Sequence, residues 1–253
     1  MYVFTPASTI REAEAYAQSL GIPNVSYSGI EVEVANAMNE ALTNAINYCP
    51  KLKDQMQFYG TAQARNRGIK KELESYYQRY FEDKGYSPPL ATKYAKKYAS
   101  HFVGKVSSNT YALAYSGEIR GMNITDELQQ IVGRWSGIGV NANIANDAAQ
   151  MLIQVKHDMF VGWHPQGCNS IRSIFDHEFG HQLDYAFGLR KNSEINAIWF
   201  GMTKSERVLA VSEYGGTNIN EFIAEAYAEY VNSPTPRPTS VKIGKIIEGM
   251  VKK

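Results

Sequence analysis

The sequence predicts an α+β protein with a helical N-terminal part, a small mixed sheet and a helical C-terminal lobe. Apolar side chains recur every three or four residues over most of the first hundred positions, which is the periodicity of helices with one buried face. Shorter segments in the middle of the chain alternate apolar and polar side chains, as half-buried strands do. The helical periodicity then returns in the last third.

Three helices are expected in the first part of the chain. Residues 31–48 and 69–81 carry apolar side chains on one helical face, and residues 90–102 form a third helical segment after Pro88 and Pro89. The third segment is rich in lysine, which is typical of a solvated helix face in a chain of balanced charge. We therefore expect no anionic partner for it.

The middle of the chain predicts strands and one more helix. Residues 110–115 and 118–124 alternate and are bounded by glycines, which indicates a hairpin or strand pair. Residues 143–153 are compatible with a helix, and residues 154–163 are interpreted as a further strand that ends before a His-Pro pair.

Two long helices and a short amphipathic tail are predicted for the rest of the chain. The helices cover residues 169–187 and 218–231, and a proline-rich linker separates the second helix from the tail. These patterns divide the chain into a mainly helical region (1–108), a central core (109–232) and a linker with a helical tail (233–253).

Composition restricts the class of protein. Of 253 residues, 44% are hydrophobic, which is enough to form a substantial core. The formal net charge of +1 gives no general attraction to nucleic acid or to an anionic membrane. No apolar run approaches the ~20 residues of a membrane span, and no signal peptide is visible. We expect a soluble chain that stays in the cytoplasm or is exported by another route, of unassigned oligomeric state.

The two cysteines and three of the histidines give no chemical signal. Cys49 and Cys168 are too few for a disulfide framework and are expected as buried thiols, although a single bridge between them stays open. His101, His157 and His164 are interpreted as ordinary histidines. His164 lies near the edge of an expected cleft, where contact with a substrate is the alternative.

The strongest chemical signal is the segment HEFGH, from His177 to His181. On a helix, these two histidines lie one turn apart on the same face and can offer two imidazoles to one ion. Glu178 lies about 100° further round, beside the ion rather than on it. This pattern is typical of a metal-dependent hydrolase, in which the carboxylate activates a water molecule. A pair of ordinary helix histidines is the alternative interpretation.

The rest of this helix supports a metal-facing side and a core-facing side. Asn169 or Ser170 can cap its start, and Gly188 suits its C-terminal end. The side opposite the histidines is apolar, so we expect it to pack on a core. Its apolar residues are Phe175, Phe179, Leu183 and Ala186.

Two later glutamates are candidates for the third ligand that a catalytic zinc ion needs. The arrangement of metzincins, with a histidine six residues after the second one, is excluded because Phe187 stands there. Glu221 and Glu225 share a helix face, so one can bind the metal while the other hydrogen-bonds a ligand histidine. Asn218 followed by Glu221 is also typical of a capping box, so spacing alone leaves the ligand open.

Two blocks of sequence resemble a known family. HEFGH followed by Leu183-Asp184, together with the run YGGTNINEFIAEAY that starts at Tyr214, resembles the catalytic domain of anthrax lethal factor and its relatives. These gluzincins include the clostridial Pro-Pro endopeptidases. The resemblance implies a zincin-like fold and a zinc-dependent endopeptidase that acts on a protein or peptide substrate. The region 1–108 would then be an upper lobe or a substrate-recognition part.

The resemblance also implies a role for each matching residue. His177, His181 and Glu221 hold one Zn²⁺ per chain, and Glu178 is the general base. Tyr214 takes the position of a tyrosine whose hydroxyl stabilises the oxyanion or protonates the leaving amine.

Further roles are expected around these residues. Glu225 hydrogen-bonds a ligand histidine, and Asp184 either orients a histidine or caps the helix. In this fold the strand before the metal helix edges the cleft and pairs with an extended substrate. The expected substrate-binding residues are therefore Met159, Phe160, Val161, Gly162 and Trp163.

Two rival interpretations stay open. A zincin scaffold can serve as a catalytically idle binding or structural module, for example in a toxin or a phage-associated component. The chain can also be an unrelated helical protein without a metal. Metal analysis and a Glu178→Gln variant separate these possibilities.

Overall fold

The computed structural model of the chain describes residues 1–119, 121 and 124–252. Over these residues the chain forms thirteen α-helices, one 3-10 helix and a mixed four-stranded sheet, so the α+β class is confirmed. In chain order the elements are α1 (Ile10–Ser19), β1 (Asn24–Ser26), α2 (Val32–Tyr48), α3 (Leu52–Gln55), β2 (Phe58–Thr61), α4 (Ala62–Asp83), α5 (Pro88–Phe102), β3 (Ala112–Tyr115), α6 (Asp126–Gly133), β4 (Gly137–Val140), α7 (Ala142–Ala145), α8 (Ala148–Phe160), α9 (Ile171–Phe187), η1 (Leu189–Lys191), α10 (Ser193–Phe200), α11 (Lys204–Ala210), α12 (Ile219–Asn232) and α13 (Pro238–Val251).

The sheet has the strand order β1-β2-β4-β3. Strands β1, β2 and β4 run parallel, and β3 runs antiparallel to β4, with Ala112 opposite Val140 and Tyr115 opposite Gly137. Strand β3 therefore forms an edge of the sheet among the described residues. Because β1 and β2 precede residue 109 and the other two strands follow it, one sheet joins both sides of the expected boundary.

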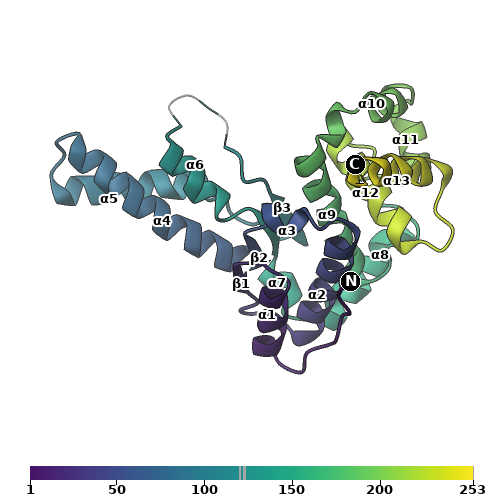
Figure 1. Cartoon of the computed structure of the whole chain (residues 1–253), viewed down its shortest axis with the longest axis horizontal. Helices are drawn as coiled ribbons and strands as arrows, with labels where there is room; N and C mark the ends of the chain where they lie inside the picture. Colours follow the sequence, from purple (N-terminus) through teal and green to yellow (C-terminus); the bar gives the residue numbers. More distant parts are fainter. Residues whose placement is uncertain (120, 122–123, 253) are drawn as a thin grey trace.

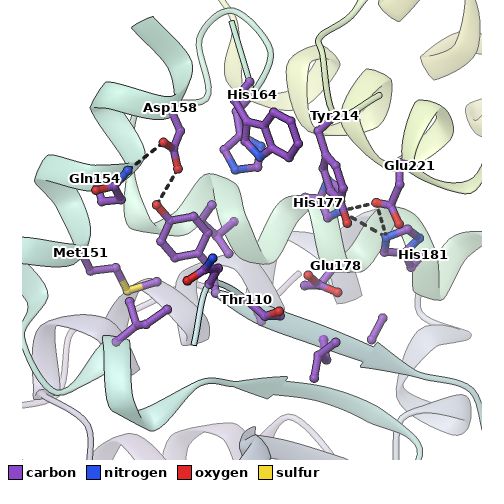
Figure 2. Close-up of a pocket in the computed structure, with 18 of the residues that line it drawn as sticks. Thr110, Met151, Gln154, Asp158, His164, His177, Glu178, His181, Tyr214 and Glu221 are labelled. Atoms are coloured by element: carbon purple, nitrogen blue, oxygen red, sulfur yellow. Dashed lines mark hydrogen bonds and ion pairs between the residues drawn. The ribbon is translucent and has the colours of Figure 1, made fainter. Parts of the chain in front are cut away.

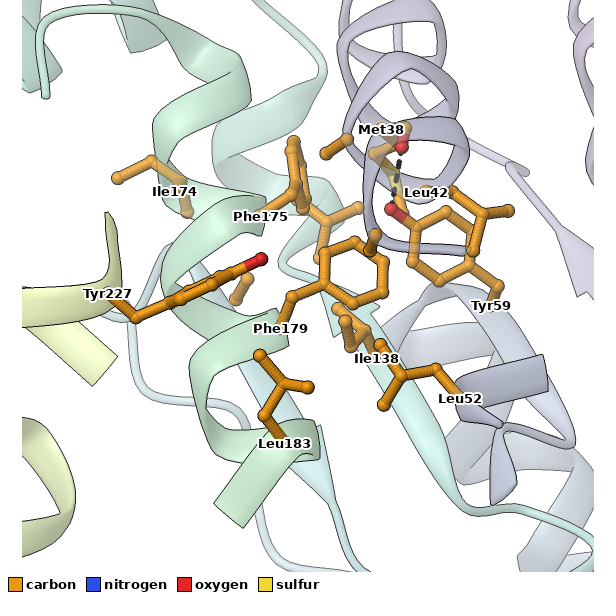
Figure 3. Packing of buried hydrophobic residues seen from close by; sticks show 14 of the residues in the cluster. Met38, Leu42, Leu52, Tyr59, Ile138, Ile174, Phe175, Phe179, Leu183 and Tyr227 are labelled. Atoms are coloured by element: carbon orange, nitrogen blue, oxygen red, sulfur yellow. Dashed lines mark hydrogen bonds between the residues drawn. The ribbon is translucent and has the colours of Figure 1, made fainter. Parts of the chain in front are cut away.

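Helix α9 lies against the sheet and against α2, and its apolar side enters the main core (Figure 3). Phe175, Phe179 and Leu183 are fully buried there, as the apolar stripe predicted. They pack among side chains of α2 and of the sheet, including Met38, Leu42, Tyr59 and Ile138. Ala186 is exposed, so the buried stripe ends one turn earlier than expected.

Helices α4, α5 and α6 form an arm that extends away from the sheet (Figure 1). The arm has its own hydrophobic cluster, which is separate from the main core and rich in tyrosine. Helix α4 begins earlier than the predicted 69–81, because the hydroxyl of Thr61 accepts a hydrogen bond from the backbone N–H of Ala64 and caps its start.

The C-terminal elements cover the other side of α9. Helix α12 packs along α9, and the predicted tail is the helix α13, which packs on α12 and α11. The predicted helices 169–187 and 218–231 are confirmed to within two residues as α9 and α12.

The strand predicted over residues 154–163 is wrong, because Ala148–Phe160 is the helix α8. Ala148, Met151 and Val155 are buried at helical spacing, and Asp147 caps the start by accepting a hydrogen bond from the backbone N–H of Gln150. Residues 154–163 alternate like a strand only when they are considered without the helical turns that precede them in α8.

The hairpin predicted over residues 110–124 is confirmed only in its first half, as β3. The partner of β3 is β4, which lies more than twenty positions further along the chain. Arg120, Met122 and Asn123 of the expected second strand lie outside the described residues.

Two other expectations from the sequence can be compared with the structure. Cys49 and Cys168 are free and buried, as expected of two thiols. None of the helices in the described part of the chain combines the length and the apolarity that a bilayer crossing requires.

Candidate functional site

Helix α9 brings two imidazoles together at the wall of a cleft. Its ends are defined by Ser170, whose hydroxyl accepts a hydrogen bond from the backbone N–H of Ser173, and by Gly188 in the left-handed conformation with φ 64°. His177 and His181 stand one turn apart on the side away from the core. Their Nε2 atoms are 3.1 Å apart, and their ring planes are nearly perpendicular.

Helix α12 adds a carboxylate to the pair (Figure 2). Oε2 of Glu221 lies 3.2 Å from Nε2 of His177 and 3.2 Å from Nε2 of His181. Asn218 caps α12 through its side chain, which accepts hydrogen bonds from the backbone N–H groups of Asn220 and Glu221. The cap therefore involves only the backbone of Glu221, so the carboxylate of Glu221 can contact the histidines. The three side chains form a group that could hold a metal ion.

The charges at this group depend on one another. Burial raises the pKa of Glu221, but His177 and His181 hold it well below its usual value. Burial lowers the pKa of His177, but Glu221 and Glu225 raise it well above its usual value. The two Nε2 atoms and Oε2 of Glu221 lie close together, and the carboxylates of Glu221 and Glu225 surround the imidazoles. This arrangement favours a positive charge between the three atoms, either a proton or a cation.

Glu225 lies one turn beyond Glu221 and is fully buried behind the histidines. Its Oε1 lies 2.6 Å from Nδ1 of His177 and 3.1 Å from Nδ1 of His164. Its Oε2 accepts a hydrogen bond from the hydroxyl of Ser212 at 2.7 Å. The carboxylate therefore orients His164 and lies against His177. The sequence had indicated His164 as an ordinary histidine, with contact to a substrate as the alternative.

Glu178 is buried beside the group without being part of it. Burial raises the pKa of Glu178, while His177 and His181 lower it and Glu221 raises it. A hydrogen bond from the backbone of Ala114 in β3 also lowers this pKa. Strand β3 thus holds the carboxylate in place, and the net shift is upward, toward the range of a group that exchanges protons near neutral pH.

Tyr214 lies over the other face of the site. Its ring stacks on His177 and on Trp163, with interplanar angles of 22° in both cases. The backbone N–H groups of Glu213 and Tyr214 donate to the carbonyls of Gly162 and Trp163. The turn after α8 therefore positions Tyr214. Burial, and next Glu221 and Glu178, raise the pKa of Tyr214, so its hydroxyl keeps its proton.

The site opens into a cleft of about 1130 Å³. One wall is the backbone of residues 110–114, which includes the edge strand β3, and the other walls come from α8, α9 and the start of α12. His177, Glu178, His181 and Glu221 all line this cleft. The cavity therefore brings together three side chains that could hold a metal ion, a buried carboxylate and the outer strand β3.

Residues 159–163 do not form the substrate-binding strand that the sequence predicted. Met159 and Phe160 end the helix α8, and the side chain of Phe160 is 84% exposed. Of the five predicted residues, Trp163 is the one that lines the cleft as the structure describes it. The edge strand of the site is β3, whose alternation was visible in the sequence but was interpreted as part of a hairpin.

Asp184 contacts Arg190 rather than an imidazole. Its Oδ1 accepts a hydrogen bond from the backbone N–H of Arg190 at 2.8 Å, and its Oδ2 lies 2.7 Å from Nε of the same residue. Asp184 therefore ties the C-terminal end of α9 to η1.

Gly180, the fourth residue of HEFGH, sets the distance between the two helices of the site. A Cβ atom at this position would lie 2.7 Å from Cα of Ala224 on α12, which is closer than real contacts allow. Ala224 stands between Glu221 and Glu225, so a separation of the helices moves both carboxylates away from the histidines. The sequence alone gave no sign of this contact, because it joins two helices that are distant along the chain.

We expect Gly180→Ala to lower the free energy of unfolding by about 1–3 kcal/mol, because it overpacks a helix crossing. A metal ion held by His177, His181 and Glu221 should also bind more than about tenfold more weakly, with Zn²⁺ as the probe. Urea unfolding and chelator competition measure the two effects. Gly249→Ala is the matched control, because a Cβ there meets nothing within 4 Å; it should be neutral or stabilising. Equal Zn²⁺ affinity in both variants would contradict the expected role of Gly180.

Comparison of the chain with protein-family models, with curated proteins and with solved structures finds no match. The geometry of the site and the resemblance of the two sequence blocks are therefore the indications of function for this chain.

Proposed function

We propose that the chain is a zinc-dependent endopeptidase of the gluzincin type, with a zincin-like fold related to that of the lethal factor-like peptidases. One observation carries the proposal: the imidazoles of His177 and His181 and the carboxylate of Glu221 converge, with a second, buried carboxylate at Glu178 beside them. Two nitrogen ligands, one oxygen ligand and an adjacent base are the components of a catalytic zinc site.

The donor atoms fit a tetrahedral ion. The three distances between them are 3.1, 3.2 and 3.2 Å. In a tetrahedral zinc site with bonds of about 2.0–2.1 Å, ligand atoms are separated by about 3.3 Å. Oε2 of Glu221 is buried and accepts no hydrogen bond from the described residues, so it is free to bind a cation. The group would thus supply three ligands to an ion at the wall of the cleft.

The residues around the ion have distinct parts in the proposed reaction. Bound zinc would polarise the scissile carbonyl and lower the pKa of a water molecule to about 7. Glu178 takes a proton from the attacking water and passes it to the departing nitrogen. The hydroxyl of Tyr214, which keeps its proton, donates a hydrogen bond to the developing oxyanion or a proton to the leaving group.

The edge strand β3 favours an extended peptide as the substrate. Its free edge lies along the cleft, where a peptide can pair with it through backbone hydrogen bonds. In this proposal β3 takes the place of the strand that the sequence had predicted over residues 154–163. The recognition role expected for residues 1–108 stays a prediction.

Metal analysis and peptide cleavage test this proposal. We expect about one zinc ion per purified chain and cleavage of members of a peptide library. Removal of the metal with a chelator should abolish cleavage, and zinc should restore it. Zinc below about 0.1 per chain, in protein that unfolds cooperatively, would contradict the proposal.

A further inference from the structure

The carboxylate of Glu225 lies against two histidines, of which only His177 belongs to the metal group. Nδ1 of His164 is hydrogen-bonded to Oε1 of this carboxylate at 3.1 Å, and Nδ1 of His177 lies 2.6 Å from the same atom. Oε2 of the same carboxylate accepts a hydrogen bond from the hydroxyl of Ser212 at 2.7 Å. A carboxylate only accepts hydrogen bonds, so His164 presents an N–H at Nδ1.

In a neutral imidazole with its proton on Nδ1, Nε2 carries a lone pair. In His164 the Nε2 atom is buried and has no hydrogen-bond partner among the residues that the structure describes. A buried polar atom without a partner is rare in folded proteins and often has a functional explanation.

His164 lies in the wall of the cleft, between Asp158 and Tyr214 (Figure 2). Only 9% of the residue is exposed, and its backbone N–H donates to the carbonyl of Asp158, so its place is well defined. Its ring is 6.2 Å from that of Tyr214 and 6.1 Å from that of Tyr111, which directly precedes β3. His164 therefore lies in the cleft wall close to the segment that leads into β3.

We infer that Nε2 of His164 accepts a hydrogen bond from a backbone N–H of the substrate. A peptide that pairs with β3 directs half of its N–H groups toward the strand and the other half away from it. One of the outward N–H groups can meet the lone pair of His164 next to the scissile bond. This inference rests on the proposed peptidase function and adds a requirement to it. The substrate residue at that position must carry an N–H, so proline and N-methylated residues are disfavoured there.

Two substitutions distinguish the effect of the Nε2 lone pair of His164 from the effect of its contact with Glu225. In His164→Asn the short amide can still donate to Glu225 from the place of Nδ1, but no atom replaces Nε2. In His164→Gln an amide oxygen reaches the place of Nε2 and can accept the substrate N–H again. His157→Asn is the control, because His157 is exposed on α8 and does not line the cleft.

The probes are a peptide that the wild type cleaves and a set of its analogues, each with one N-methylated amide. For the unmethylated peptide we expect His164→Asn to raise KM about tenfold and to change kcat less than about threefold, with zinc content unchanged. His164→Gln should recover part of the loss, and His157→Asn should behave as the wild type.

Binding measured in a Glu178→Gln background gives a readout that does not depend on turnover. One N-methylated analogue should bind about tenfold more weakly than the parent peptide, and addition of His164→Asn should cause no further loss for that analogue. If every analogue loses the same additional affinity with His164→Asn, or if this variant loses zinc, the histidine acts only through Glu225 and the inference fails. If zinc-loaded wild type neither cleaves nor binds any library peptide, the proposed function fails as well.

Discussion

Glu178→Gln is expected to lower kcat for a cleaved peptide by about 10²–10⁴-fold while the protein keeps its zinc. Glutamine has nearly the same shape as glutamate, and its side-chain oxygen can still accept the hydrogen bond from the backbone of Ala114. It cannot take a proton from water, which is the step assigned to Glu178. Because Glu178 is outside the group formed by His177, His181 and Glu221, the metal content should not change.

The matched control for this variant is Glu213→Gln, which changes an exposed glutamate one residue before Tyr214. Zinc content by elemental analysis and initial rates of peptide cleavage give both readouts on the same preparations. Full biological effect of Glu178→Gln with zinc bound would show that catalysis is irrelevant. The chain would then be the catalytically idle module that the sequence left open.

The grouping of His177, His181 and Glu221 was predictable because each contribution is local. Helical spacing alone places the two imidazoles on one face of α9. The start of α12 is determined by Asn218, whose cap leaves the side chain of Glu221 free. The sequence could not show that both helices meet, and only the resemblance of the two blocks supplied that step.

The walls of the cleft could not be predicted in the same way. Strand β3 pairs with β4, which follows only after the helix α6, and not with the residues directly after β3. Pairing between segments this far apart leaves no local pattern in the sequence. Residues 154–163 contain too few apolar positions to distinguish a strand from the end of a helix. Only the start of α8 at Ala148 shows that they continue a helix. The sequence gave no sign of the contact between His164 and Glu225, because the two residues lie 61 positions apart.

The second large effect is expected at Arg237, in the segment between α12 and α13. Its guanidinium group donates to both carboxylate oxygens of Glu229, which is fully buried, and to the backbone carbonyls of Leu209 and Val211. The hydroxyl of Ser240 donates to the same carboxylate. The proline-rich segment therefore contains the residue that neutralises a charge in the interior and joins α11, α12 and α13.

We expect Arg237→Met to lower the free energy of unfolding by about 3 kcal/mol, because it leaves the carboxylate of Glu229 buried without its cation. Urea unfolding measures the loss, and the double variant Glu229→Gln/Arg237→Met should recover much of it since no buried charge remains. Arg79→Met is the matched control: Arg79 also pairs with a glutamate, Glu127, but both side chains are more than half exposed. It should cost less than about 1 kcal/mol. Equal losses of unfolding free energy in the two single variants would show that the Arg237–Glu229 pair is no better shielded from water than the exposed Arg79–Glu127 pair. The stability of the C-terminal helices would then have to come from their apolar contacts.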